Sequence, residues 1–242
     1  AGSRAKPDQI MMVRKELGLD KPLVFQYFQY MKKMLKGDLG ISFTSHREIV
    51  DDLKEKLPIT FELIAIAWIV SLGFGLLFGV IAALNEGRWI DKTILIISSI
   101  SLSIPIFFLS LLLQIIFFDT LGWFPLQGRM DTFLELTNPL ETVTGFTLVD
   151  AFITENYEVL FDAAWHMVLP AASLAFGYIG YIARITRTSL LEVMSQNYIL
   201  SARASGISER VLFFQYGLRN AISPVLTVMG LAIAILMVFT YY

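Results

Sequence analysis

The chain has 242 residues, of which 55% are hydrophobic and 17% are charged, and its mean hydropathy is +0.63. An ordinary soluble domain is less apolar and carries more charge than this. The formal net charge of −2 argues against nucleic acid as a partner, and the lack of cysteine excludes disulfides and thiolate metal sites.

Before the first apolar stretch, residues 1–60 are predicted to form an extracytoplasmic helical segment. Pro7 begins a possible helix that reaches Leu17, and residues 24–35 repeat aromatic and apolar residues at helical spacing. Such amphipathic pieces either lie along a membrane surface or pack against a helix bundle, and the sequence leaves both alternatives open.

Four apolar stretches predict transmembrane helices in the remaining residues, 61–242. A helix must present about 20 apolar residues to cross the hydrocarbon core, because lipid offers no partners to exposed backbone groups. The four stretches are residues 61–84, 93–118, 165–183 and 221–242. Pro105 predicts a kink within the second stretch. The expected fold class is therefore an all-α integral membrane protein.

The distribution of charge orients these spans. Residues 184–219 contain five arginines and only two acidic residues, whereas the loop 119–164 is rich in Asp and Glu. Because short cytoplasmic loops are enriched in Lys and Arg, we expect residues 190–219 inside the cell and the loop 119–164 outside. Residues 1–60 are then also outside despite their basic residues, which the rule tolerates in long translocated segments.

The stretch from Leu190 to Pro224 reads as helix, turn and helix. The first helix is expected to continue from Leu190 through Ala202 into a run of small residues and to stop at Gly206, which suits a left-handed terminator. Ser208 can cap the next helix, which is expected to extend towards Pro224. Small residues at a helix end permit close approach of another protein surface. We therefore expect this region to form a protruding surface that binds another protein.

At this point the sequence resembles a known family, the permease subunits of ABC importers and in particular those of the oligopeptide/dipeptide type. The resemblance rests on ordered blocks along nearly the whole chain: residues 37–42 (GDLGIS), 57–60 (LPIT), 103–105 (SIP), 121–125 (LGWFP), 169–170 (LP), 184–187 (RITR), 201–206 (SARASG) and 218–221 (LRNA). Leu200 departs from the Glu of the general coupling motif, and Arg219 follows Leu218 where many relatives have Pro.

The resemblance implies a type I ABC importer transmembrane domain with six spans, of which the four here would be the second to the fifth. It implies a second homologous permease subunit, two cytoplasmic ATP-binding subunits and an extracytoplasmic solute-binding protein as partners, in the inner or plasma membrane of a prokaryote. Residues 190–219 become the coupling region, and the residues expected in a groove of the ATPase are Tyr198, Ser201, Ala202, Arg203, Ala204, Ser205, Gly206 and Ile207. The substrate could be a dipeptide, an oligopeptide, nickel or an oligosaccharide.

Within the apolar stretches, a few residues invite a functional interpretation. Ser99, Ser103 and Pro105 are candidates for lining the translocation path, although serines also pack helices closely. Gly75 and Gly79 form a GxxxG pattern, which predicts close helix contact. Glu62 lies near a membrane boundary, where a capping or snorkelling role is expected rather than proton transfer.

The sequence contains no GxxxxGK[ST] phosphate loop, no HExxH motif and no nucleophile beside a plausible base. We therefore expect a non-catalytic transport subunit that binds no cofactor or metal itself, with ATP and Mg used by its partners. Two alternatives remain. An ion-coupled secondary transporter would show inverted repeats and midplane charges, and a membrane scaffold or receptor would not depend on an ATPase.

Overall fold

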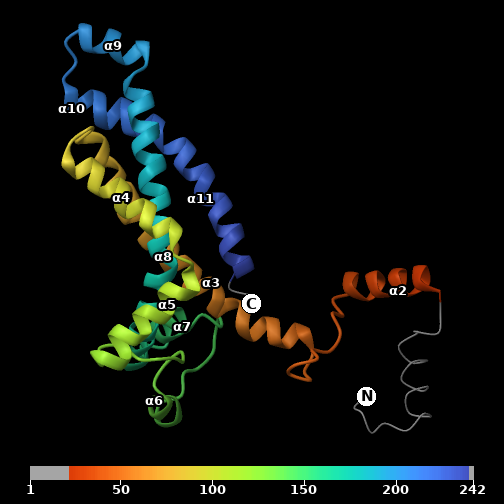
Figure 1. The fold of residues 1–242 in the computed structure, drawn as a ribbon. Coiled ribbons are helices and arrows are strands. Elements are labelled where there is room, and N and C mark those ends of the chain that lie inside the picture. The colour runs from red at the N-terminus through yellow and green to blue at the C-terminus, as the bar shows by residue number, and fades with distance from the viewer. Residues whose placement is uncertain (1–21, 240–242) are drawn as a thin grey trace, which may run out of the picture. The chain divides into compact units, whose positions relative to one another are not determined.

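The computed structural model describes the backbone of residues 22–239 and the side chains of residues 22–231, and this part of the chain is helical (Figure 1). One isolated β-bridge joins Ile41 and Glu48. The helices are α2 (Leu23–Leu35), α3 (Ile49–Leu84), α4 (Trp89–Ser103), α5 (Ile106–Gln114), the π-helix η1 (Ile115–Thr120), α6 (Thr132–Thr137), α7 (Thr147–Ile153), α8 (Tyr157–Met194), α9 (Asn197–Ala204), α10 (Glu209–Val211), the π-helix η2 (Leu212–Leu218) and α11 (Arg219–Phe239). The all-α prediction is confirmed for these residues.

The chain divides into two compact units, Ala1–Leu57 and Pro58–Tyr242, with the boundary inside α3. In the first unit, the helix expected over residues 24–35 is confirmed as α2, and none of its residues is buried. The helix expected from Pro7 to Leu17 lies outside the described residues.

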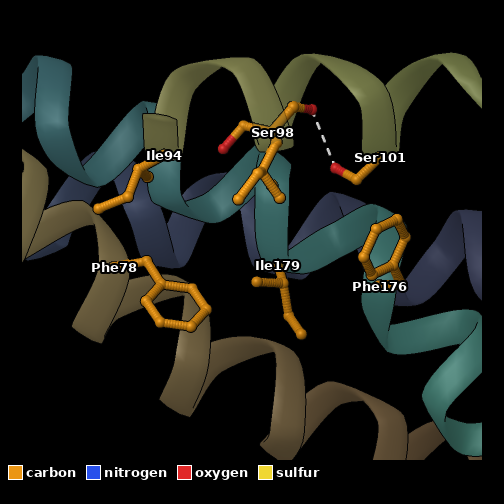
Figure 2. Close-up of a pocket in the computed structure, with 8 residues that line it drawn as sticks. Phe78, Ile94, Ser98, Ser101, Phe176 and Ile179 are labelled. Carbon is orange, nitrogen blue, oxygen red and sulfur yellow. Dashed lines mark hydrogen bonds between the residues drawn. The ribbon is translucent and has the colours of Figure 1, made fainter. Parts of the chain in front are cut away.

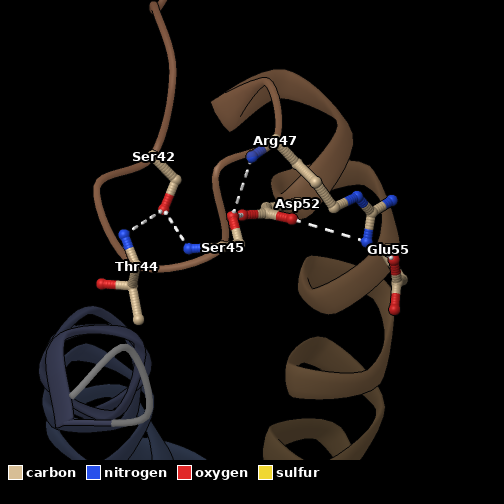
Figure 3. A network of polar contacts seen from close by, with 6 residues as sticks. All are labelled: Ser42, Thr44, Ser45, Arg47, Asp52 and Glu55. Atoms are coloured by element: carbon tan, nitrogen blue, oxygen red, sulfur yellow. Dashed lines mark hydrogen bonds and ion pairs between the residues drawn. The ribbon is translucent and has the colours of Figure 1, made fainter.

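A polar network in the first unit fixes the turn that leads into α3 (Figure 3). The Ser42 hydroxyl accepts a hydrogen bond from the backbone N–H of Ser45 at 3.2 Å, and the Ser45 hydroxyl donates to Asp52. Arg47 pairs with Glu55 at 2.8 Å and lies 3.6 Å from Asp52. The turn is thus tied to the first turns of α3 by its own side chains.

In the second unit, the apolar stretches become long helices. Among the described residues, α3 and α8 are each long and apolar enough to cross a membrane, and a third crossing is added if α4 and α5–η1 count as one broken span. The predicted spans at residues 61–84 and 165–183 lie within α3 and α8. The stretch 221–242 falls on α11, and its last residues lie outside the described range.

The second apolar stretch is not the single kinked helix that we expected. α4 ends at Ser103, Ile104 is extended with φ −83° and ψ 122°, and the next helix turns by 98°. A residue before proline avoids the helical conformation, and Pro105 has no N–H to continue the helix. The predicted break point is confirmed, but the size of the bend makes two helices of what we expected to be one.

Helix α8 packs against α4, α5, α7 and α11 and lies at the centre of the second unit (Figure 1). Its backbone also lies close to α3: a Cβ added at Gly75 would come within 2.6 Å of Ile182 Cβ, and one at Gly79 within 2.5 Å of Thr186 Cβ. Only glycine fits at these two positions. The packing role predicted for the GxxxG pattern is confirmed.

Gly180 of α8 makes a similar close contact with α4, where an added Cβ would collide with the Ser101 hydroxyl and come 2.9 Å from Ser98 Cα. A cavity of about 160 Å³ lies beside this contact, and Figure 2 shows it lined by apolar side chains of α3, α4 and α8 together with Ser98 and Ser101. The Ser101 hydroxyl donates to the Ser98 carbonyl at 2.9 Å. Ser98 and Ser101 are both buried and serve helix packing.

A buried ion pair ties the start of α4 to α8. Arg187 donates from Nε to one oxygen of Asp91 at 2.5 Å and from Nη2 to the other at 2.7 Å. The Asp91 carboxylate is 2% exposed and also accepts the Gly87 N–H at 2.9 Å. Two-point pairing of this kind fixes orientation as well as distance, so the turn between α3 and α4 is held against α8.

Two carboxylates organise the segment between α6 and α8. The buried Glu62 of α3 accepts the backbone N–H groups of Thr147 at 2.9 Å and Leu148 at 2.7 Å, which caps the start of α7. The expected capping role is confirmed. Asp150 accepts hydrogen bonds from three consecutive backbone N–H groups, residues 143–145, and from the Thr144 hydroxyl.

The close contact at Gly79 gives a first prediction. Gly79→Leu should destabilise the protein by about 3 kcal/mol, because the side chain has no space against Thr186. Gly73→Leu is the matched control, since a Cβ at Gly73 of the same helix meets nothing within 4 Å. Thermal unfolding of the purified variants in detergent measures the difference, and equal melting temperatures would contradict the packing that we describe.

Asp150 gives a prediction about pH. Burial raises the pKa of Asp150, but the hydrogen bonds from Thr144 and the neighbouring backbone outweigh burial and leave its pKa below the ordinary value. A lowered folded-state pKa adds stability that is complete above the unfolded-state pKa, about 3.9, and disappears as pH falls through the folded-state value. Asp150→Asn should therefore lower the melting temperature at neutral pH and have a shrinking effect below about pH 4. A difference that stays constant with pH would argue against an ionised Asp150.

Candidate functional site

The predicted docking region folds as a short helix across the end of α8 (Figure 1). α8 ends at Met194, and α9 begins at Asn197. The single helix that we expected from Leu190 through Ala202 is therefore wrong. The Ser195 hydroxyl donates back to the Glu192 carbonyl at 2.8 Å, and Gln196 is extended with φ −71° and ψ 148°, which lets the chain change direction.

The predicted stop at Gly206 is confirmed. Gly206 has a φ of +83°, its N–H donates to the Arg203 carbonyl at 3.0 Å, and the Ile207 N–H donates to the Ala202 carbonyl at 3.2 Å. This pair of hydrogen bonds around a left-handed glycine is the Schellman motif. Ser208 occupies the N-cap position of α10 as predicted, but its side chain makes no capping hydrogen bond.

Three contacts hold α9 in place. Ile199 is fully buried, and the Tyr198 hydroxyl accepts a hydrogen bond from Asn220 Nδ2 at 3.3 Å. Arg203 donates from Nε and Nη2 to the two carboxylate oxygens of Glu209, at 2.5 and 3.1 Å, and this contact lowers the pKa of Glu209. No sequence pattern predicts this pair, which neutralises an arginine expected to face another protein.

The remaining predicted docking residues form one outward surface. Ser201, Ala204, Ser205 and Gly206 are exposed, as is Arg203, while Ala202 and Ile207 are half-buried; Tyr198 is 46% exposed. A Cβ at Gly206 would meet nothing within 4 Å. We call these eight residues the α9 surface. Its small side chains allow another protein to approach the backbone closely, and the buried Ile199 anchors α9 to the helices beneath it.

Beyond the α9 surface, the helix expected from Glu209 towards Pro224 is confirmed as α10, η2 and α11 in succession. The middle part, Leu212–Leu218, is π-helical, which the sequence did not predict. Gly217 lies against α8, where an added Cβ would come 2.9 Å from the Met194 sulfur. The end of α8 and η2 are thus packed together.

The candidate path residues lie on one exposed face of the α4–α5 bend. Ser99, Ser103 and Pro105 are all exposed, in contrast to the buried Ser98 and Ser101. The Ser103 hydroxyl donates to the Ser99 carbonyl at 2.9 Å. No described contact joins these three residues to the α9 surface. They therefore form a separate candidate site.

One residue at this face was missed by the sequence analysis. Arg184 of α8 donates from Nη2 to the Ser99 hydroxyl at 2.8 Å. In the sequence Arg184 appears as one of the arginines that orient the chain and as the first residue of the RITR block 184–187, and neither pattern predicts its contact with Ser99. Among the residues that the structure describes, no group of three or more His, Asp or Glu side chains could hold a metal ion.

Comparison with known proteins identifies the family. Residues 75–241 match the family described as binding-protein-dependent transport system inner membrane component, and residues 1–64 match its N-terminal counterpart. The chain is 38% identical to the probable D,D-dipeptide transport system permease protein DdpB of Escherichia coli over 96% of its own length and 68% of that protein. It is also 38% identical to the di/tripeptide transport system permease protein DppB of Pseudomonas aeruginosa, over 97% and 68% of the two chains.

A third relative, the dipeptide transport system permease protein DppB of Escherichia coli, is 36% identical over 98% of this chain and 70% of that protein. The family match covers more than half of the chain, and the predicted resemblance to permeases is confirmed. The assignments as a non-catalytic transport component and as a protein of the bacterial inner membrane are confirmed with it. The chain therefore belongs to the family of binding-protein-dependent transport system inner membrane components.

Proposed function

We propose that this permease is the membrane-spanning subunit of an ATP-driven ABC importer for peptides, and that it forms part of the translocation path. The peptide substrate is suggested by the names of relatives that match almost the whole chain. The observation that carries the proposed coupling to ATP is the α9 surface, which is exposed, rich in small residues and anchored by the buried Ile199.

The proposed assembly contains a second homologous permease, two cytoplasmic ATP-binding subunits and an extracytoplasmic solute-binding protein. ATP and Mg bind to the ATP-binding subunits. The fold is a type I importer domain in which α3, the α4–α5 pair, α8 and α11 supply four of six spans. Among the described residues, α3 and α8 are long and apolar enough to cross a membrane, and the α4–α5 pair adds a third span if it is one broken crossing. We propose α11 as the fourth span, in a chain that covers 68 to 70% of the length of its relatives.

Coupling follows from how the α9 surface is connected. A movement of the ATP-binding subunits is transmitted through α9 only if α9 stays in place on the helix bundle, and the buried Ile199 is its anchor there. α8 is one helix of 38 residues that leads from α9 to the opposite end of the unit. Its ion pair with Asp91 carries α4 with it, so a displacement at α9 reaches the α4–α5 bend.

Reconstitution tests the function. The permease is purified with its partner permease, ATP-binding subunits and binding protein, and placed in lipid vesicles with labelled dipeptide. Uptake that requires both ATP and the binding protein is expected. A scaffold would copurify without uptake, and a secondary transporter would accumulate dipeptide under an ion gradient without ATP.

Gly206 provides a sharper prediction about coupling. Gly206→Leu should reduce ATP-dependent uptake by at least about tenfold, a typical size for loss of coupling between two sites. The new side chain would project from the α9 surface into the space that the ATP-binding subunit is proposed to occupy. Uptake and ATP hydrolysis are measured in the same vesicles, and the ATP used per peptide should rise.

Gly37→Leu is the control for backbone strain. Gly37 has a φ of +84°, follows α2 in the same Schellman arrangement, and also has nothing within 4 Å of an added Cβ. A left-handed leucine costs about 1–2 kcal/mol at either position. Equal uptake by the two variants would show that Gly206 acts only as a helix terminator.

A further inference from the structure

Arg184 carries a charge that no carboxylate in the described part of the chain neutralises. Its neighbour Arg187, one turn further along α8, is fully paired with Asp91. Arg184 is exposed and has a single described hydrogen bond, from Nη2 to the Ser99 hydroxyl at 2.8 Å. A guanidinium has five N–H donors, so most of its donors remain available.

The Arg184 side chain is directed along the membrane-spanning helices and away from the end that bears α9. Ser99 lies eight residues after Asp91 in α4, which is about 12 Å further along that helix. Side chains of a helix lean towards its N-terminus, and for α8 this is the direction away from α9. An arginine that snorkelled to the nearer lipid headgroups would point the opposite way.

The face that receives Arg184 carries the Ser99 and Ser103 hydroxyls among exposed apolar side chains, and no described acid pairs with Arg184. The Ser99 hydroxyl donates to the Leu95 carbonyl at 2.8 Å, so towards Arg184 it acts as an acceptor. Ser103 lies one turn further on the same exposed face and leads to Pro105. Arg184 directly follows the predicted span 165–183, and its side chain reaches back along that span to Ser99. A charge that faced hydrocarbon there would be costly, so such residues face a water-filled cavity or a protein partner.

We propose that Arg184, held by Ser99, is a binding site for a carboxylate group on the translocation path. The proposal rests on the proposed function and adds to it a contact with the substrate. A planar guanidinium binds a carboxylate through two parallel hydrogen bonds. Every peptide with a free C-terminus has such a group whatever its sequence. Arg184 is therefore a binding residue that suits many peptides, and Ser99 is a positioning residue.

The test uses the complete transporter in phosphatidylcholine vesicles with labelled Ala-Ala as the probe. Arg184→Gln should lower uptake by about tenfold, the loss of a charge-assisted hydrogen bond, while ATP hydrolysis stimulated by the binding protein stays unchanged. Arg184→Glu should be lower still, because it repels the carboxylate, and Arg184→Lys should lie between Arg184→Gln and wild type. Arg88→Gln, which removes another exposed arginine, is the control and should transport normally.

Ser99→Ala is a second variant, which tests the proposal even if loss of the arginine impairs folding. It keeps the charge and should raise the KM for uptake with little change in kcat, because it removes only the hydroxyl that positions Arg184. Melting temperature and assembly with the partners are measured for each variant. The proposal is overturned if Arg184→Gln shows wild-type uptake. If Arg184→Gln does not assemble, wild-type uptake by both Arg184→Lys and Ser99→Ala overturns it.

A lipid phosphate, like a carboxylate, offers anionic oxygens that a guanidinium binds. A second arm of the experiment therefore repeats the assay with phosphatidylglycerol added to the vesicles. Wild-type uptake that increases with phosphatidylglycerol, and Arg184→Gln uptake that does not, would assign Arg184 to lipid and overturn the proposal. Uptake that is independent of phosphatidylglycerol is expected. If wild type hydrolyses ATP but imports no dipeptide, the proposed function fails and the carboxylate site fails with it.

Discussion

The close contact of α8 with two neighbouring helices determines how the second unit is built. Glycines at 75 and 79 of α3 and at 180 of α8 leave no space for a side chain, so the helix backbones approach closely. Helices in a membrane gain little from hydrophobic burial against each other, and small residues at their contacts let dispersion forces act instead. Because α8 also packs against α5, α7 and α11, these contacts position most of the unit.

Charged groups at the ends of the apolar helices follow a consistent rule. Asp91 is paired with Arg187, and Glu62 caps α7. Burial of an ionised group is tolerated when its hydrogen-bonding capacity is satisfied inside the protein. Arg184 differs from these groups, since it is exposed and its one described partner is a neutral hydroxyl. That difference, rather than the presence of an arginine, is what points to a ligand.

The two candidate sites are connected through one structural element. The α9 surface lies at one end of α8, and Arg184 lies on the same helix between that end and the α4–α5 bend. The Arg187–Asp91 pair stands between them and joins α8 to α4. Under the proposed coupling, a displacement of the α9 surface would reach the proposed substrate contact through α8.

The sequence by itself determined the helical class, the apolar stretches, the break at Pro105, the helix stop at Gly206 and the family. These depend on local chemistry: backbone groups in lipid must be satisfied within a helix, proline lacks an N–H, and glycine tolerates a positive φ. The end of α8 at Met194, the 98° bend, the Arg203–Glu209 pair and the contact of Arg184 with Ser99 were decided only by the tertiary structure. Each depends on where a helix or side chain lies relative to a neighbour, which residue spacing along one chain does not specify.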